Sequence, residues 1–354
     1  MSSDLFADAP ELAPPTTLTD RSINEFSHAL DVFAATHHDR PVPLDLRMKM
    51  RPEWGAVFAN LLAGHYADLP LAVRFPTENS NQLQLARANV CFALARHARA
   101  DFSETVRDHF LARWLQDWEP ADVQQPLFHL DDVATEENAP KEMAKELVAY
   151  LNPDRLPRSQ AAEDRDSVIR PWLSRLIGKP SIEYRPWRHQ LYHDVSLSSM
   201  EVLDNIRDHS QLDDDGLCSL SLFTTTGGVG GKNDKLYLSV WDNGCGMPAA
   251  MAKHFPQGAD PLEMVLSALN GTMPHKQRDR GRGLHRVTTL IERVGGDLFV
   301  ATGPAAGGSI VIEHTGGQEA PVTGRVDGLP VRGTVIVMTL PLRPIASPDL
   351  GVNG

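Results

Sequence analysis

Residues 201–210 read EVLDNIRDHS, and this polar decapeptide decides how the rest of the sequence is interpreted. On a helix of 3.6 residues per turn, Glu201, Asn205 and Asp208 fall on one narrow stripe. The apolar side chains point the other way, toward an expected core: Val202, Leu203 and Ile206. An amide oxygen suits Mg²⁺, and a carboxylate one turn away can orient or deprotonate a water or hydroxyl. For this helix alone, a solvated polar face is the alternative.

A second segment, WDNGCGMP at 241–248, follows an alternating strand that ends at Asp242. A carboxylate at a strand end can accept a hydrogen bond from an exocyclic amine such as that of adenine. Gly244 and Gly246 permit positive φ and a close backbone approach, and Met247 can cover a flat ring. A simple turn is the alternative, because Asp-Asn-Gly is common in turns.

A third segment, RGRGLHRV at 280–287, opens an amphipathic helix. Gly281 and Gly283 precede it, and the free N–H groups of its first turn, with Arg280 and Arg282 beside them, form an anion site. On its own, a GxG before a helix is weak evidence.

The fourth segment, RGTVIVMTLPL at 332–342, is a hydrophobic strand that opens with Gly-Thr. Thr334 can form a hydrogen bond near the base of a nucleotide. For this segment alone, an ordinary buried strand is the stronger interpretation.

Together, and in this order, the four segments resemble the nucleotide-binding boxes of the GHKL superfamily. That superfamily contains type II DNA gyrases, MutL mismatch-repair proteins, large heat-shock chaperones, histidine kinases and anti-sigma-factor serine kinases. The resemblance covers residues 190–342. It implies an α+β Bergerat fold, an α/β sandwich of a mostly antiparallel sheet and a helical layer, and it implies ATP and Mg²⁺ as ligands.

The resemblance also implies roles for single residues. Asn205 looks like the Mg²⁺ ligand, with Asp208 beside it on the nucleotide side, and Glu201 looks like the general base. By similarity to the boxes, Asp242 looks like the carboxylate that binds adenine, with Thr334 beside it. The loop under the base is assigned to Gly244, Gly246 and Met247. The loop on the phosphate side is assigned to Gly281, Arg282, Gly283 and Leu284.

Of two further residues near the boxes, His209 stays open and Cys245 is not expected to carry chemistry. His209 gives the pattern ExxxNxxxH, which is similar to that of the serine kinases, but a packed or surface histidine is an equal alternative. Cys245 occupies a variable position of its box. Histidine kinases differ at the position of Glu201, and the segment before the helix lacks a phosphoacceptor pattern, so a sensor kinase is disfavoured.

Between the second and third boxes, residues 248–280 are the expected ATP lid. Asp260 is the expected N-cap of a helix that ends at Gly271. Lys276 and Arg280 follow in a basic, glycine-rich stretch and could fold over the β- and γ-phosphates. A loop whose charges only keep it soluble is the alternative.

The rest of the chain is predicted in four parts. Residues 1–21 are a flexible tail, and 22–100 alternate strand and helix as in a small α/β domain, for which STAS-like domains are a fold-level analogy. Residues 101–189 are a connector of helices and loops, in which 141–151 look helical, and 343–354 are a second tail.

Composition narrows the function classes. A net charge of −12 disfavours a general nucleic-acid binder. The three cysteines lack CxxC spacing, which disfavours a zinc site or a disulfide framework, and apolar runs of membrane-spanning or signal-peptide length are absent from the sequence. We therefore expect a cytoplasmic protein without a membrane partner.

Three functions remain open at this point. The first is an ATP-binding regulatory protein that hydrolyses ATP with Mg²⁺ and acts as a switch through its lid, toward a protein partner or in a homodimer. The second is a protein serine/threonine kinase of the anti-sigma-factor type. The third is an ATP sensor or scaffold in which Glu201 has no chemical duty.

Overall fold

The computed structural model describes these residues: 17–37, 40–46, 49–74, 90, 93, 100–102, 128–129, 147–151, 186–210, 218–225, 234–274, 283–305, 308–318 and 320–342. Most of the predicted tails and most of the connector lie outside these ranges. So do all of residues 79–98 except Val90 and Ala93, a segment whose pattern predicts a helix. Within the part of the chain that the structure describes, none of the helices is long and apolar enough to cross a bilayer.

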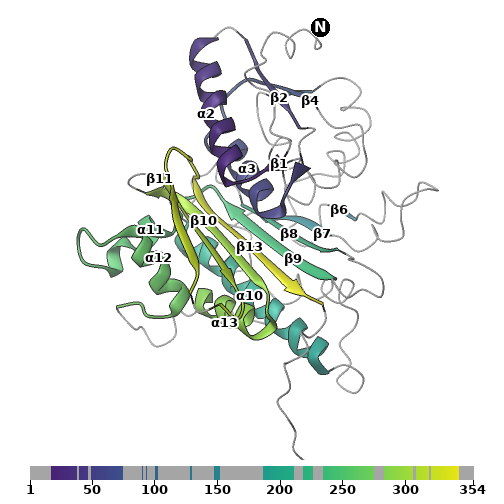
Figure 1. The fold of residues 1–354 in the computed structure, drawn as a ribbon, viewed down its shortest axis with the longest axis vertical. Coiled ribbons are helices and arrows are strands. Elements are labelled where there is room, and N and C mark those ends of the chain that lie inside the picture. Colours follow the sequence, from purple (N-terminus) through teal and green to yellow (C-terminus); the bar gives the residue numbers. More distant parts are fainter. Residues whose placement is uncertain are drawn as a thin grey trace, which may run out of the picture.

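An eight-stranded antiparallel sheet forms the centre of the molecule (Figure 1), in the order β12-β11-β10-β13-β9-β8-β7-β6. Its strands are β6 (Phe128–His129), β7 (Leu147–Leu151), β8 (Cys218–Thr225), β9 (Lys235–Asp242), β10 (Asp297–Ala305), β11 (Gly308–Thr315), β12 (Val322–Val326) and β13 (Gly333–Pro341). Antiparallel pairing lets short connections join neighbouring strands, as in β10 and β11. The predicted α+β class is confirmed.

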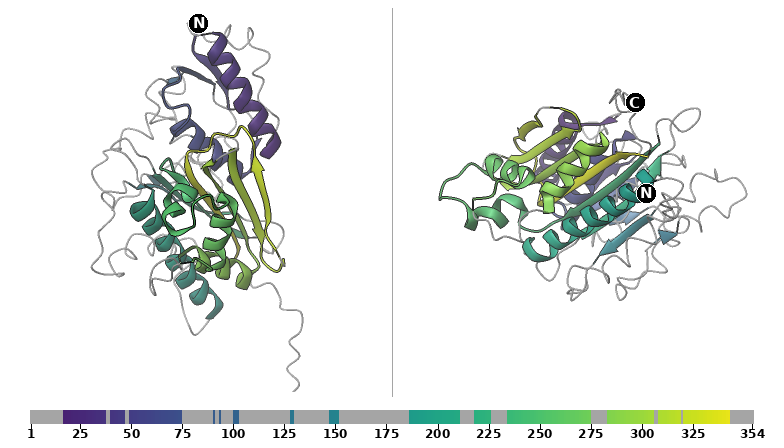
Figure 2. Two further views of the ribbon diagram at one scale, coloured as in Figure 1. Left: turned by 90° about the vertical axis from the view of Figure 1, so that its left-hand side faces the viewer. Right: turned by 90° about the horizontal axis from the view of Figure 1, so that it is seen from below.

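Helices cover one face of this sheet (Figure 2): α10 (Pro186–His209), α12 (Pro261–Asn270) and α13 (Gly283–Val294). Short helices α11 (Gly246–Met251) and η5 (Ala252–His254) lead from β9 to α12. Asp260 caps α12 by accepting a hydrogen bond from the amide of Leu262, and Gly271 ends it with φ 68°. Both features agree with the sequence prediction.

The apolar stripes of these helices meet alternate residues of the central strands. Ile336, Met338 and Leu340 of β13 are buried against this helical layer. The helices contribute a matching set: Val202, Ile206, Val265, Leu269, Val287, Leu290 and Ile291. The period of two in the strands and of 3.6 in the helices thus produces one core.

The N-terminal part forms a small unit of its own. Its elements are β1 (Thr17–Leu18), α2 (Asp20–Thr36), β2 (Val42–Asp45), β3 (Lys49–Met50), α3 (Pro52–Ala63), β4 (Leu71–Arg74) and β5 (Ala100–Phe102). Strands β2, β4 and β5 pair in parallel, as the alternation of strands and helices predicts. Helix α2 begins at Asp20, inside the predicted tail, because Thr19 and Ser22 form a capping box.

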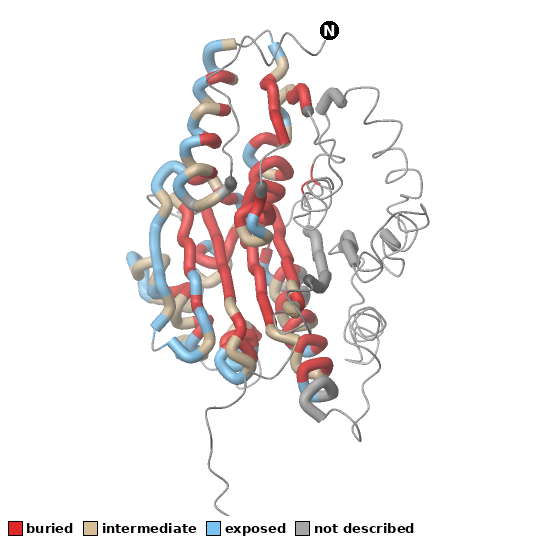
Figure 3. Tube along the Cα trace, turned by 45° about the vertical axis from the view of Figure 1, so that its right-hand side comes forward, coloured by how far each residue is buried: buried red, intermediate tan, exposed pale blue. Residues whose placement is uncertain are grey.

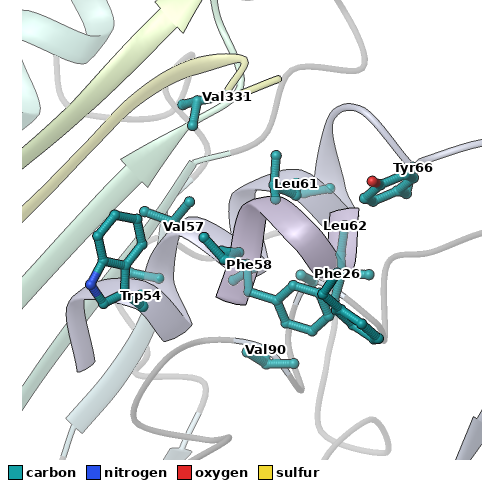
Figure 4. Packing of buried hydrophobic residues seen from close by; sticks show 14 of the residues in the cluster. Phe26, Trp54, Val57, Phe58, Leu61, Leu62, Tyr66, Val90 and Val331 are labelled. Atoms are coloured by element: carbon teal, nitrogen blue, oxygen red, sulfur yellow. The ribbon is translucent and has the colours of Figure 1, made fainter. Parts of the chain in front are cut away.

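This unit packs on the other face of the large sheet (Figure 3), so that much of β9, β10 and β13 is buried on both sides. Trp54 of α3 meets Phe299 of β10 edge to face, with ring centroids 5.1 Å apart. Val335 and Val337 of β13 belong to the same cluster as Phe58 and Leu61 of α3. Figure 4 shows the part of this cluster around Phe58 and Leu61. The sequence pattern predicts one helical layer, and this second layer is additional to it.

Three elements differ from the sequence analysis. Residues 147–151 form strand β7, paired along its length with β8, whereas the segment 141–151 looks helical in the sequence. A short apolar run fits either structure, and pairing with a sheet edge decides. Strand β12 is missed because its residues are largely exposed and show no apolar alternation. Helix α10 begins at Pro186, so the helix that carries the decapeptide starts fifteen residues before Glu201.

Candidate functional site

The start of α13 lies directly against the polar stripe of α10. A Cβ placed on Gly283 would lie 2.8 Å from Oε2 of Glu201 and 3.1 Å from Nδ2 of Asn205. Only a residue without a side chain fits there unless both polar groups move. The first and third sequence segments are therefore in contact, and Glu201 and Asn205, both partly exposed, lie beside the first turn of a helix.

Glu201 also forms an ion pair that the sequence analysis misses. Its Oε1 accepts a hydrogen bond from Nη1 of Arg286, three residues into α13. The Glu201 side chain is 28% exposed and that of Arg286 is 56% exposed, so water screens the pair. Arg286 is the last arginine of RGRGLHRV, but the sequence does not predict its contact with Glu201, which depends on how α10 and α13 pack.

At the other end of the site, Asp242 and Thr334 lie directly opposite each other in the β9–β13 pair. The Asp242 side chain is buried, and its Oδ1 accepts a hydrogen bond from the amide of Gly244 at 2.9 Å. Burial raises the pKa of Asp242 to about 7, although hydrogen bonds from the backbones of Gly244 and Thr334 act to lower it. A buried carboxylate at a strand end is able to accept one specific donor.

Thr302 of β10 is a further residue of this end that the sequence analysis misses. Its Oγ1 accepts a hydrogen bond from the amide of Met247 at 2.9 Å and donates one to the carbonyl of Gly333 at 3.0 Å. It also lies 3.2 Å from Oγ1 of Thr334. The feature of the sequence that could have indicated this role is a threonine in a largely apolar strand, just before Gly303.

Two glycines allow the loop after β9 to approach its neighbours. A Cβ on Gly244 would lie 2.3 Å from the carbonyl oxygen of Ser210, and one on Gly246, which has φ 76°, would lie 2.1 Å from that of Gly303. The amide of Cys245 donates to the Ser210 carbonyl at 2.7 Å. The loop is thus fastened to the end of α10, one turn beyond Asn205, and all four sequence segments converge.

The structure describes only some of the remaining predicted site residues. Lys276, Arg280, Gly281 and Arg282 lie outside the described residues, and of Asp208 only the backbone is described. Met247 is buried in the core of the helical layer, and Leu284 packs against that core.

His209, which the sequence left open, ends α10 and is contacted there by Cys245. His209 is exposed. Its carbonyl accepts a weak hydrogen bond from Sγ of Cys245. Burial, followed by the nearby Asp242 carboxyl, raises the pKa of the Cys245 thiol, which makes the thiolate scarcer at neutral pH.

The donor chemistry near Asn205 suits a cation held jointly with a ligand. Among the described side chains, groups of three or more His, Cys, Asp or Glu residues that could hold a metal are absent. Mg²⁺ keeps several waters and is commonly bound through one or two protein oxygens together with phosphates, so a single amide oxygen fits that mode.

One comparison with known proteins supports the resemblance to the GHKL superfamily. Residues 199–344 match the family model described as histidine kinase-, DNA gyrase B-, and HSP90-like ATPase. Among solved structures, the chain is similar to the histidine kinase domain of the blue-light activated histidine kinase from Erythrobacter litoralis EL346, at 12% identity over 82% of this chain and 92% of that one. The TM-score of that match is 0.23. No curated protein matches the chain.

Proposed function

Because residues 199–344 belong to the GHKL superfamily of ATPases, we propose that this chain is an ATP-binding regulatory protein that hydrolyses ATP with Mg²⁺ and switches as its lid closes. The observation that carries the proposal is the convergence of four segments on two ends of one site. Gly283 contacts Glu201 and Asn205 at one end, and Thr334 lies opposite Asp242 at the other.

At the adenine end, the buried Asp242 carboxylate accepts a hydrogen bond from the exocyclic amine of the base. A guanine places a carbonyl oxygen at that position, and two acceptors would then face each other in a buried site. Thr334 and Thr302 line the same end, and the Thr302 hydroxyl holds the backbone of Gly333 and Met247 in place.

At the phosphate end, the amide oxygen of Asn205 would hold a Mg²⁺ bound together with the triphosphate, and that cation would offset the charge of the phosphates. The N-terminal turn of α13 supplies backbone N–H groups, for which anionic oxygens are suitable acceptors. Glu201, one turn before Asn205, orients and deprotonates the attacking water.

The ion pair between Arg286 and Glu201 supports a switch rather than a constantly active site. In the ligand-free protein the guanidinium occupies one oxygen of the proposed general base. Turnover then requires Arg286 to release that oxygen, and the arriving triphosphate is a competing partner for a guanidinium. Nucleotide binding and the activation of Glu201 are thereby coupled.

The proposal is tested by calorimetric titration of the purified full chain with ATP, with and without Mg²⁺, followed by phosphate release. We expect Mg²⁺-dependent binding and slow hydrolysis in the wild type, and binding without hydrolysis in Glu201→Gln. Transfer of labelled phosphate to a serine or threonine of a partner protein would replace hydrolysis by kinase activity. Tight binding with neither reaction would make the chain an ATP sensor, and absence of binding would refute the proposal.

A further inference from the structure

The N-terminal unit reaches the adenine end of the site through one buried side chain. Asn60, in the last turn of α3, is fully buried. Its Nδ2 donates to the carbonyl of Asp242 at 2.7 Å and to that of Arg332 at 2.6 Å, and its Oδ1 accepts from the amide of Arg332 at 3.2 Å. One amide therefore joins the two strands β9 and β13 where both meet the site.

The same turn of α3 makes further contacts with these segments. The side chain of Asn243 donates to the carbonyl of Ala63 at 3.3 Å. A Cβ on Gly64 would lie 3.2 Å from Cβ of Arg332. The loop after β9 and the start of β13 are thus held from the N-terminal side, while Ser210 and Thr302 hold them from the other side.

The backbone to which Asn60 is hydrogen-bonded also orients Asp242 and Thr334, the two groups proposed to bind adenine. Gly333 has φ 81°, and a Cβ there would lie 2.2 Å from the Asp242 carbonyl and 2.6 Å from its Oδ1. The spacing between β9 and β13 at this point therefore sets the position of the Asp242 carboxyl and of Thr334. A buried carbonyl without its donor is costly, so loss of the Asn60 amide would move these strands.

We propose that Asn60 is a positioning residue for adenine recognition, and that through it the N-terminal unit sets the affinity of the chain for ATP. This inference rests on the proposed ATP site. Coupling of this kind is reciprocal, so ATP in turn stabilises the last turn of α3. The N-terminal unit is then the part of the chain through which a signal can raise or lower nucleotide binding.

The test compares full-length variants in titrations with ATP and with GTP. Asn60→Leu keeps the approximate side-chain volume and removes all three hydrogen bonds of the Asn60 amide. Gly64→Ala adds a methyl group in close contact with the Arg332 side chain. The matched control is Tyr66→Phe, which breaks a buried hydrogen bond with Ser27 inside the same unit, 2.6 Å between the two oxygens, without touching the site.

We expect Asn60→Leu to bind ATP at least about tenfold more weakly, which corresponds to about 1.4 kcal/mol, with GTP affinity changed much less. Gly64→Ala should change the ATP to GTP ratio in the same direction by a smaller factor. A merely structural role would lower both affinities together, and Tyr66→Phe should leave the ratio unchanged. Equal loss of ATP and GTP affinity in Asn60→Leu and in Tyr66→Phe would overturn the inference.

Hydrogen exchange of the wild type keeps the inference testable if Asn60→Leu does not fold. ATP should slow amide exchange in residues 60–64 and leave residues 20–30 of α2 unchanged. Unchanged exchange in residues 60–64 at saturating ATP would overturn the inference even though ATP binds. If the wild type binds no ATP, the proposed function itself fails, and the two failures are therefore distinguishable.

Discussion

Arg286 on α13 holds Glu201 on α10 in an ion pair, and an equivalent pair lies two helical turns away. There Arg293 pairs with Asp194, so that both acids and both arginines are seven residues apart on antiparallel helices. The two pairs make similar contacts between the same helices, but only the first involves a residue of the candidate site.

The second ion pair, Arg293 with Asp194, provides an internal control for the role of Arg286. Arg286→Gln should raise ATP turnover by about two- to fivefold, because freeing one screened ion pair of Glu201 is worth about 0.4–1 kcal/mol. Arg293→Gln removes the neighbouring pair and should leave turnover unchanged. Phosphate release at saturating ATP measures both. If both variants change turnover alike, the effect belongs to helix packing and not to Glu201.

Asp242 should make ATP binding depend on pH. With a pKa of about 7 in the ligand-free protein, and a bound amine that favours the ionised carboxylate, affinity should fall about tenfold from pH 8 to pH 6. Titration calorimetry at several pH values measures the change. Asp242→Asn should lack this component, and the nucleotide's own titration is common to both proteins. An identical pH profile in the two would exclude Asp242 as the base-reading group.

The same carboxyl should affect the stability of the ligand-free protein. Its pKa is raised from 3.8, so the stability that it contributes is fully present below that value and is lost as pH rises through about 7. Chemical denaturation at pH 5 and pH 8 should therefore show that Asp242→Asn is less sensitive to this rise than the wild type. The opposite trend would mean that the folded protein favours the ionised form.

Variants of Asn205 and Glu201 should separate ATP binding from ATP hydrolysis. Asn205→Ala should abolish the Mg²⁺-dependent part of ATP binding, since it removes the protein oxygen of the shared cation. Glu201→Ala should keep ATP affinity within about threefold and lose at least about 100-fold in turnover, as removal of a general base does. Calorimetry and phosphate release on the same preparations distinguish the two. Normal turnover in Glu201→Ala would remove that residue from catalysis.

Gly283 should be intolerant of a single methyl group for reasons of function and not of folding. The Cβ of Gly283→Ala would approach Glu201 and Asn205, but alanine is a better helix former than glycine. We expect unchanged or higher thermal stability with ATP turnover lowered at least about tenfold. Thermal denaturation and phosphate release check this together, and full activity in the variant would show that the α13 start does not border the site.

The sequence alone predicts the residues whose chemistry is local. Asp260 and Gly271 are recognisable ends of α12 because caps depend on a few neighbouring residues. The four nucleotide boxes were recognisable by spacing, and the structure brings their described parts together. Their individual roles remain predictions, and Lys276, Arg280, Gly281 and Arg282 lie outside the described residues.

The sequence does not predict contacts between distant elements. Asn60 reads as one polar residue in an apolar helix, and its hydrogen bonds cross 182 and 272 residues of chain. The Arg286 ion pair and the hydrogen bonds of Thr302 likewise depend on packing. Residues 147–151 form strand β7 because they pair with β8. The strand propensity of these five residues alone does not predict that pairing.

A structure of the full chain with Mg²⁺ and a non-hydrolysable ATP analogue tests the central claim most directly. We predict adenine against Asp242 and Thr334, the triphosphate at the start of α13, and a cation bound to the amide oxygen of Asn205. Nucleotide density elsewhere on the chain, or adenine whose amine does not face Asp242, would contradict the account.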